Sequence, residues 1–205
     1  MKREPIVLAV SICCSLAIMS WIVWSERPVP AAAAAATAMG VGATGDASTA
    51  PSAGVPADPP PVDPAQAAAL EAAALADTGD PAPRVALGNL YYHAQTFEAA
   101  IPWFEEALAL QPDDLDSSTN LGVCYFYAGR AERAIEQLER SLEIEPDHPQ
   151  TLLNVGIVRA FALDDIEGAK VAWERVIEVA PDGREARAAG EALGRVDEMR
   201  AGTSR

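Results

Sequence analysis

Few side chains in this chain have the type and spacing that catalysis or metal binding requires. The only histidines, His93 and His148, lack a second ligand at the spacing of a metal site. No nucleophile lies in a recognisable elbow or beside a base, and the acidic pair Asp164 and Asp165 falls in a predicted turn, where carboxylates commonly cap helices. We therefore expect no enzyme activity, no metal site and no cofactor.

Nucleotide and nucleic-acid ligands are also disfavoured. Gly40, Gly42 and Gly45 spell G-x-G-x-x-G, but a dinucleotide site needs a strand before this motif and a helix after it. Polyalanine precedes the motif here, and a stretch of Gly, Ser and Pro follows it. The net charge of −15 further argues against a polyanionic partner, because phosphate binding needs clustered Lys and Arg.

The remaining polar and aromatic side chains are placed by a repeat of about 34 residues. Small residues, alanines and prolines recur at this distance: Gly88, Gly122 and Gly156; Ala100, Ala134 and Ala169; Pro112, Pro146 and Pro181. Such a period is typical of an all-α solenoid with one helix–turn–helix unit per repeat. The small residues allow two antiparallel helices to cross closely, and each proline ends the second helix. A solenoid of this kind is a curved binding surface.

The repeat resembles the tetratricopeptide repeat (TPR) family. The first copy carries the signature as Leu87, Gly88, Tyr91, Ala100, Phe104, Ala107 and Pro112. The resemblance predicts TPR 1 at 81–114, TPR 2 at 115–148 and TPR 3 at 149–183, with one inserted residue near 163–165. It also predicts an N-terminal capping helix at 65–79 and a C-terminal capping helix at 184–199.

Two positions depart from the family pattern. A tryptophan is common near the start of the first helix of each repeat, but Arg84, Ser118 and Leu152 occupy that position here. Arg159 stands where a tyrosine is usual. We therefore expect the third repeat to be looser, or adapted to packing against the end of the solenoid.

The family resemblance implies that the first helix of each repeat lines a concave peptide-binding groove. The residues carried over to that groove are Asn89, Tyr92, His93, Asn120, Val123, Phe126, Tyr127, Asn154, Ile157 and Phe161. Amides can bond a peptide backbone while aromatic rings cover its side chains, which suits a helix or an extended peptide. Two alternatives stay open: an aromatic such as Tyr92 or Phe126 packs within the fold, or the helix at 184–199 fills the groove.

Binding of a C-terminal carboxylate is disfavoured. Some TPR domains clamp such a group with cations and two asparagines, and Asn89 and Asn120 stand at the asparagine positions. Val85, Gln150 and Asn154 occupy the positions where the cations would be. Without a cation to neutralise a buried carboxylate, the clamp is incomplete.

The N-terminal region predicts an anchor and a linker. Residues 6–24 are uncharged, and at ~1.5 Å per residue they would span a bilayer core of roughly 30 Å. We therefore expect a cytoplasmic tail at 1–5, a transmembrane signal-anchor at 6–24 and a disordered Ala/Pro/Gly linker at 25–64. The TPR domain would then be periplasmic. The alternative is a secreted protein, cleaved near Ala36.

The sequence thus predicts a membrane-tethered scaffold that binds another protein or peptide, and no small-molecule substrate. A narrower alternative, resting on architecture, is a periplasmic TPR factor for cytochrome c maturation that handles apocytochromes. Another is a structural subunit of an envelope secretion or polysaccharide complex.

Overall fold

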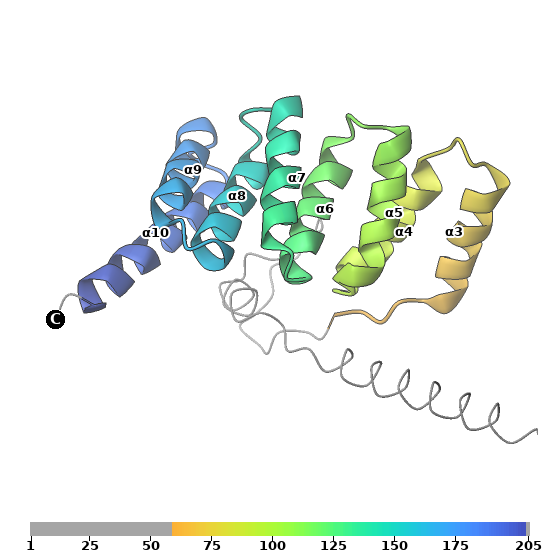
Figure 1. Cartoon of the computed structure of the whole chain (residues 1–205), viewed down its shortest axis with the longest axis horizontal. Helices are drawn as coiled ribbons and strands as arrows, with labels where there is room; N and C mark the ends of the chain where they lie inside the picture. The colour runs from red at the N-terminus through yellow and green to blue at the C-terminus, as the bar shows by residue number, and fades with distance from the viewer. Residues whose placement is uncertain (1–58, 204–205) are drawn as a thin grey trace, which may run out of the picture.

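A computed structural model describes residues 59–203, which form eight helices and no strands. The helices are α3 (Pro64–Ala76), α4 (Ala82–His93), α5 (Phe97–Leu110), α6 (Leu115–Tyr127), α7 (Ala131–Ile144), α8 (Pro149–Ala162), α9 (Ile166–Val179) and α10 (Arg184–Thr203). They stand side by side in chain order (Figure 1). The predicted all-α solenoid is thereby confirmed for the described residues.

The row of helices has a concave and a convex side. All substantial contacts join helices one or two places apart along the chain, and contacts between helices two places apart occur only among α4, α6, α8 and α10. These even-numbered helices therefore lie closer together than α5, α7 and α9 do. The row must curve with α4, α6 and α8 on its inner side, which we call the concave face.

Polar caps and prolines set the helix boundaries. Asp114 accepts a hydrogen bond from the backbone N–H of Ser117 at 3.3 Å, and Asp165 accepts one from Gly168 at 2.9 Å. These bonds satisfy N–H groups that have no partner inside the helix. Proline begins α3 and α8, where its missing N–H costs nothing.

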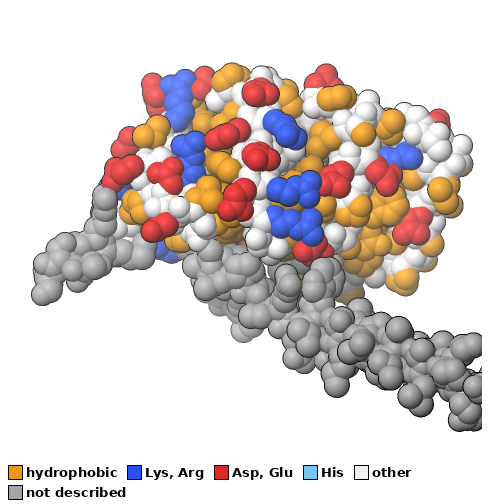
Figure 2. Space-filling view, viewed as in Figure 1, with side chains coloured by type: hydrophobic (Ala, Val, Ile, Leu, Met, Phe, Trp, Pro, Cys, Tyr) orange, Lys and Arg blue, Asp and Glu red, His pale blue; other side chains and the backbone are white. Residues whose placement is uncertain are grey.

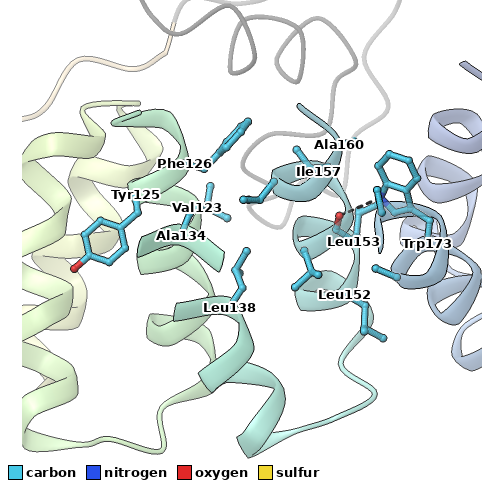
Figure 3. Packing of buried hydrophobic residues seen from close by; sticks show 14 of the residues in the cluster. Val123, Tyr125, Phe126, Ala134, Leu138, Leu152, Leu153, Ile157, Ala160 and Trp173 are labelled. Atoms are coloured by element: carbon cyan, nitrogen blue, oxygen red, sulfur yellow. Dashed lines mark hydrogen bonds between the residues drawn. The ribbon is translucent and has the colours of Figure 1, made fainter. Parts of the chain in front are cut away.

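Glycines let the two helices of each repeat touch. A Cβ added at Gly88 would lie 2.6 Å from Phe104, one at Gly122 2.7 Å from Leu138, and one at Gly156 2.2 Å from Trp173. All three large side chains are fully buried. The indole N–H of Trp173 also donates to the carbonyl oxygen of Leu153 at 3.2 Å, shown by the dashed line in Figure 3.

The turn inside each repeat needs one residue in the left-handed region. This residue is Gln95 (φ 55°), Gly129 (φ 73°) and Asp164 (φ 55°) in the successive repeats. The inserted residue of the third repeat is accommodated at the end of α8, where the N–H of Leu163 bonds to the carbonyl five residues back, at Val158. The corresponding bonds of Ala94 and Ala128 reach back four residues.

The predicted membrane localisation is contradicted. None of the helices within residues 59–203 combines the length and apolar character needed to cross a bilayer. Even α10, the longest at 20 residues, carries charged side chains along its whole length. The segments expected at 1–5 and 6–24, and most of the linker expected at 25–64, lie outside the described residues.

Candidate functional site

The predicted groove residues all lie on α4, α6 and α8, but they differ in exposure. Four are buried in the core, with 3–6% of their surface exposed: Tyr92, Val123, Phe126 and Ile157. Five are half-buried: Asn89, Asn120, Asn154, Tyr127 and Phe161. His93 is exposed at the end of α4.

Tyr92 is a core residue. Its ring makes edge contacts with Phe97 and Phe104, with centroids 5.8 and 6.5 Å apart. Burial raises the pKa of its hydroxyl, and burial likewise raises the pKa of the neighbouring Cys124 thiol. The alternative that this aromatic packs within its own fold therefore describes Tyr92.

Phe126 belongs to a cluster between α6 and α8. Figure 3 shows Val123 and Phe126 on α6 directed toward Ile157 and Ala160 on α8. A small hollow of about 10 Å³ remains there, and the half-buried side chains Tyr127 and Asn154 border it. That volume holds at most about one water, so a partner would have to bind across these side chains and not in a preformed pocket.

Amides and hydroxyls link the three helices of the concave face. Asn120 donates from Nδ2 to Oδ1 of Asn89 at 3.3 Å, which joins α6 to α4. The buried hydroxyls of Thr119 and Thr151 lie 2.8 Å apart and join α6 to α8. Asn154, at the equivalent position of α8, is half-buried.

The half-buried side chains Asn89, Asn120 and Asn154 form what we call the amide row. A stacked aromatic pair borders it. The rings of Phe97 and Tyr127 are 4.4 Å apart and nearly parallel, and Phe126 meets Tyr127 edge-on. Phe97 was missed in the sequence, because it begins α5, the second helix of its repeat. The only feature of the sequence that could have indicated Phe97 is an aromatic residue between the two glycine- and alanine-marked helices of the first repeat.

The concave face is nearly free of charge. Arg84 of α4 turns to Glu106 on α5, and Arg159 of α8 turns to Glu139 on α7, at 3.1 and 3.2 Å. Asp116 lies in the first turn of α6. Apart from the exposed Asp116, the surface left for a partner consists chiefly of amides, aromatic rings and aliphatic groups.

The C-terminal helix does not cover this face. Helix α10 packs on α9 and α8 through Ala186, Ala189, Ala192 and Val196, which are buried. It makes no substantial contact with α4 or α6 within the described residues. It therefore closes the end of the solenoid.

A second hollow lies on the opposite, convex side of the described residues. It has a volume of about 520 Å³ and opens between α5 and α7, over the outward side of α6. We call it the outer hollow; it is lined chiefly by Leu108, Ser118, Leu121, Tyr125, Arg140 and Ile144. The repeat pattern does not predict this hollow, although Ser118 departs from the family pattern.

This arrangement defines a class of protein: an α-solenoid of helix–turn–helix repeats with a curved inner face that carries few charges. A family model described as tetratricopeptide repeat matches residues 81–147. Residues 81–147 therefore belong to the tetratricopeptide repeat family and form part of a protein–protein interaction domain of that type. This fold typically serves as a binding scaffold and not as a catalyst.

Solved structures agree on the fold. A crystal structure of MamA is 20% identical with a TM-score of 0.55, covering 64% of this chain and 79% of that one. The second TPR domain of human RPAP3, in complex with an HSP70 peptide, is 18% identical with a TM-score of 0.50, covering 56% and 98%. The Arabidopsis OM64 TPR domain is 16% identical with a TM-score of 0.50, covering 62% and 96%. None of the curated proteins compared matches the chain.

Proposed function

We propose that the protein is an adaptor whose concave face binds a largely uncharged peptide or helix of another protein. The observation that carries this proposal is the half-buried amide row bordered by Tyr127 and Phe161, on a face whose arginines turn away. Amides can pair with a peptide backbone, and rings can cover apolar side chains. The RPAP3 domain, which has the same fold, was solved with a peptide bound.

The test is capture from an extract of the source organism with the full chain as bait. The test bait carries Asn154→Ala with Phe161→Ala, which removes one amide and one ring from the concave face. Tyr92 and Phe126 are left intact, because truncating such buried rings costs about 3–5 kcal/mol and would unfold part of the repeat.

A matched control bait carries Val171→Ala with Glu174→Ala, two exposed positions on α9 away from the concave face. All baits should have the same thermal midpoint by circular dichroism. We expect a partner that is held by the unchanged and control baits and lost by the test bait. The same partners on all three baits would reject the concave face as the binding site.

A further inference from the structure

The outer hollow has the volume of a ligand-binding site and a lining of both apolar and polar side chains. Its volume of about 520 Å³ falls within the range of roughly 300–1,000 Å³ found for ligand pockets. The base is formed by Leu121 and Ser118 of α6, and the sides by Leu108 of α5 and Ile144 of α7. These apolar side chains share the lining with polar and charged ones, namely Glu105, Tyr125, Arg133, Gln137, Arg140 and Glu143.

The small side chain at 118 explains why the space is open. Ser118 is 1% exposed, and its hydroxyl accepts hydrogen bonds from Gln137 and Ser141 at 2.7 and 2.8 Å. The buried polar atoms of the floor are therefore satisfied without a ligand. A ligand that reaches the floor of the hollow would therefore meet no buried polar side-chain atom that lacks a partner.

Exposed apolar side chains continue from the hollow along the convex side. Leu110 and Ile144, in the last turns of α5 and α7, are 41% and 39% exposed. Figure 2 shows apolar side chains interspersed with acidic and basic ones on this face. The apolar surface available to a partner is therefore larger than the hollow itself.

The two faces of the solenoid differ in their number of charged residues. The outer helices α5, α7 and α9 carry ten acidic and four basic residues, whereas α4, α6 and α8 carry one acidic residue and two arginines. Within the hollow, Arg133 is paired with Glu105 at 2.9 Å, and its guanidinium stacks 4.2 Å above the Tyr125 ring. Glu105 also accepts a hydrogen bond from the Tyr125 hydroxyl, and burial together with this bond raises the pKa of Tyr125.

The lining has no net charge, because two arginines and two glutamates contribute to it. The sign of the electrostatic potential at the hollow is therefore set by the helices around it. On α7, Glu132 and Glu136 are exposed and make no ion pair within the described residues. The two helices that flank the hollow, α5 and α7, carry seven acidic and two basic residues. This excess of negative charge beside the apolar part of the lining favours a partner that is basic on one side and apolar on the other.

We propose that the outer hollow binds a positively charged amphipathic helix of a partner protein. Such a helix lies along α5 and α7, which at 14 residues each are about 21 Å long. Its apolar side chains enter between Leu108, Leu121 and Ile144, and its Lys or Arg side chains meet the acidic side chains of α5 and α7. This site is independent of the concave face and permits the chain to hold two partners at once.

The probe is a fluorescein-labelled synthetic helix with Leu on one face and Lys on the other, titrated onto the full chain by fluorescence anisotropy. A second probe replaces every Lys by Glu. The decisive variant is Ile144→Lys, which adds a positive charge inside the hollow. The matched control is Val171→Lys, which adds the same charge to the same convex side, at a 66% exposed position of α9 outside the hollow.

We expect the Lys probe to bind the unchanged chain and the Glu probe to bind at least tenfold more weakly. Ile144→Lys should weaken the Lys probe at least tenfold, while Val171→Lys and the concave variant Phe161→Ala should change its affinity less than twofold. Equal losses in the two lysine variants would show nonspecific attraction to an acidic surface and overturn the proposal. Absent binding of the Lys probe, or equal binding of the Glu probe, would overturn it as well.

Discussion

At the residue scale, glycine serves two different purposes in this chain. Gly156 allows Trp173 to lie against α8, whereas nothing lies within 4 Å of a Cβ built at Gly190 on α10. We predict that Gly156→Ala lowers the free energy of unfolding by about 1–3 kcal/mol through overpacking. Gly190→Ala should raise it by about 1 kcal/mol, because alanine is the better helix former.

Urea unfolding of the full chain, followed by circular dichroism, measures both changes. Gly194 offers a control for Gly190, since a Cβ there also meets open space and Gly194→Ala should stabilise by a similar amount. Equal effects of alanine at Gly156 and Gly190 would show that helix propensity alone governs both sites, and would contradict the packing argument.

Sequence placed the candidate residues on the correct helices but could not rank their exposure. The 34-residue period identifies equivalent positions, and so Asn120 and Phe126 were both assigned to the groove. Burial depends on how closely α6 and α8 approach, which the pattern of one repeat does not contain: Phe126 is 5% exposed and Asn120 is half-buried. Phe97 was missed for a related reason, because its contact with Tyr127 joins two repeats.

At the element scale, α3 depends on one arginine. Arg84 donates to the carbonyl oxygens of Ala74 at 3.1 Å and Asp80 at 2.9 Å, and it also pairs with Glu106 on α5. The buried side chains of α3 are only two alanines, Ala67 and Ala74. A helix with so little apolar burial needs these polar contacts to stay docked.

We predict that Arg84→Met releases α3 and leaves the repeats folded. Hydrogen exchange with mass spectrometry should show protection of residues 64–76 falling at least tenfold, with α6 to α9 unchanged. Arg84→Lys keeps the charge but not the branched donor geometry, so it should give an intermediate loss. Unchanged protection of α3 in the Met variant would mean that Arg84 does not hold this helix.

Arg84 also shows where the sequence pattern reaches its limit. It departs from a common tryptophan, but the pattern does not reveal its role, because its hydrogen-bond partners lie in the preceding helix, in the loop after that helix and on α5. Ser118 stands at the same position of the second repeat and opens the outer hollow. The regular features, namely the glycines, alanines and terminal prolines, were sufficient to predict the helix pairs. The positions that depart from the family pattern, Arg84 and Ser118, determine contacts and a hollow that the pattern does not predict.

At the scale of the whole molecule, the solenoid is a chain of neighbour contacts with no long-range closure. Substantial contacts join only helices one or two places apart, so damage at one end should reach the other end only through each intervening pair. The C-terminal end offers a sharp test, because Val196 of α10 is 1% exposed and packs into the end of the core.

We predict that Val196→Asp, which places an unpaired charge in that core, unravels α10 and raises exchange in α9 and α8, while α4 and α5 keep their protection. Gly194→Asp is the matched control: it adds the same charge two residues away, on the exposed side of α10, and should leave α8 and α9 unchanged. A uniform loss of protection from α4 to α10 in the Val196 variant would show that the solenoid opens as one cooperative unit. A loss that fades toward α4 would show that the concave face of the first two repeats can stay formed when the C-terminal end is open.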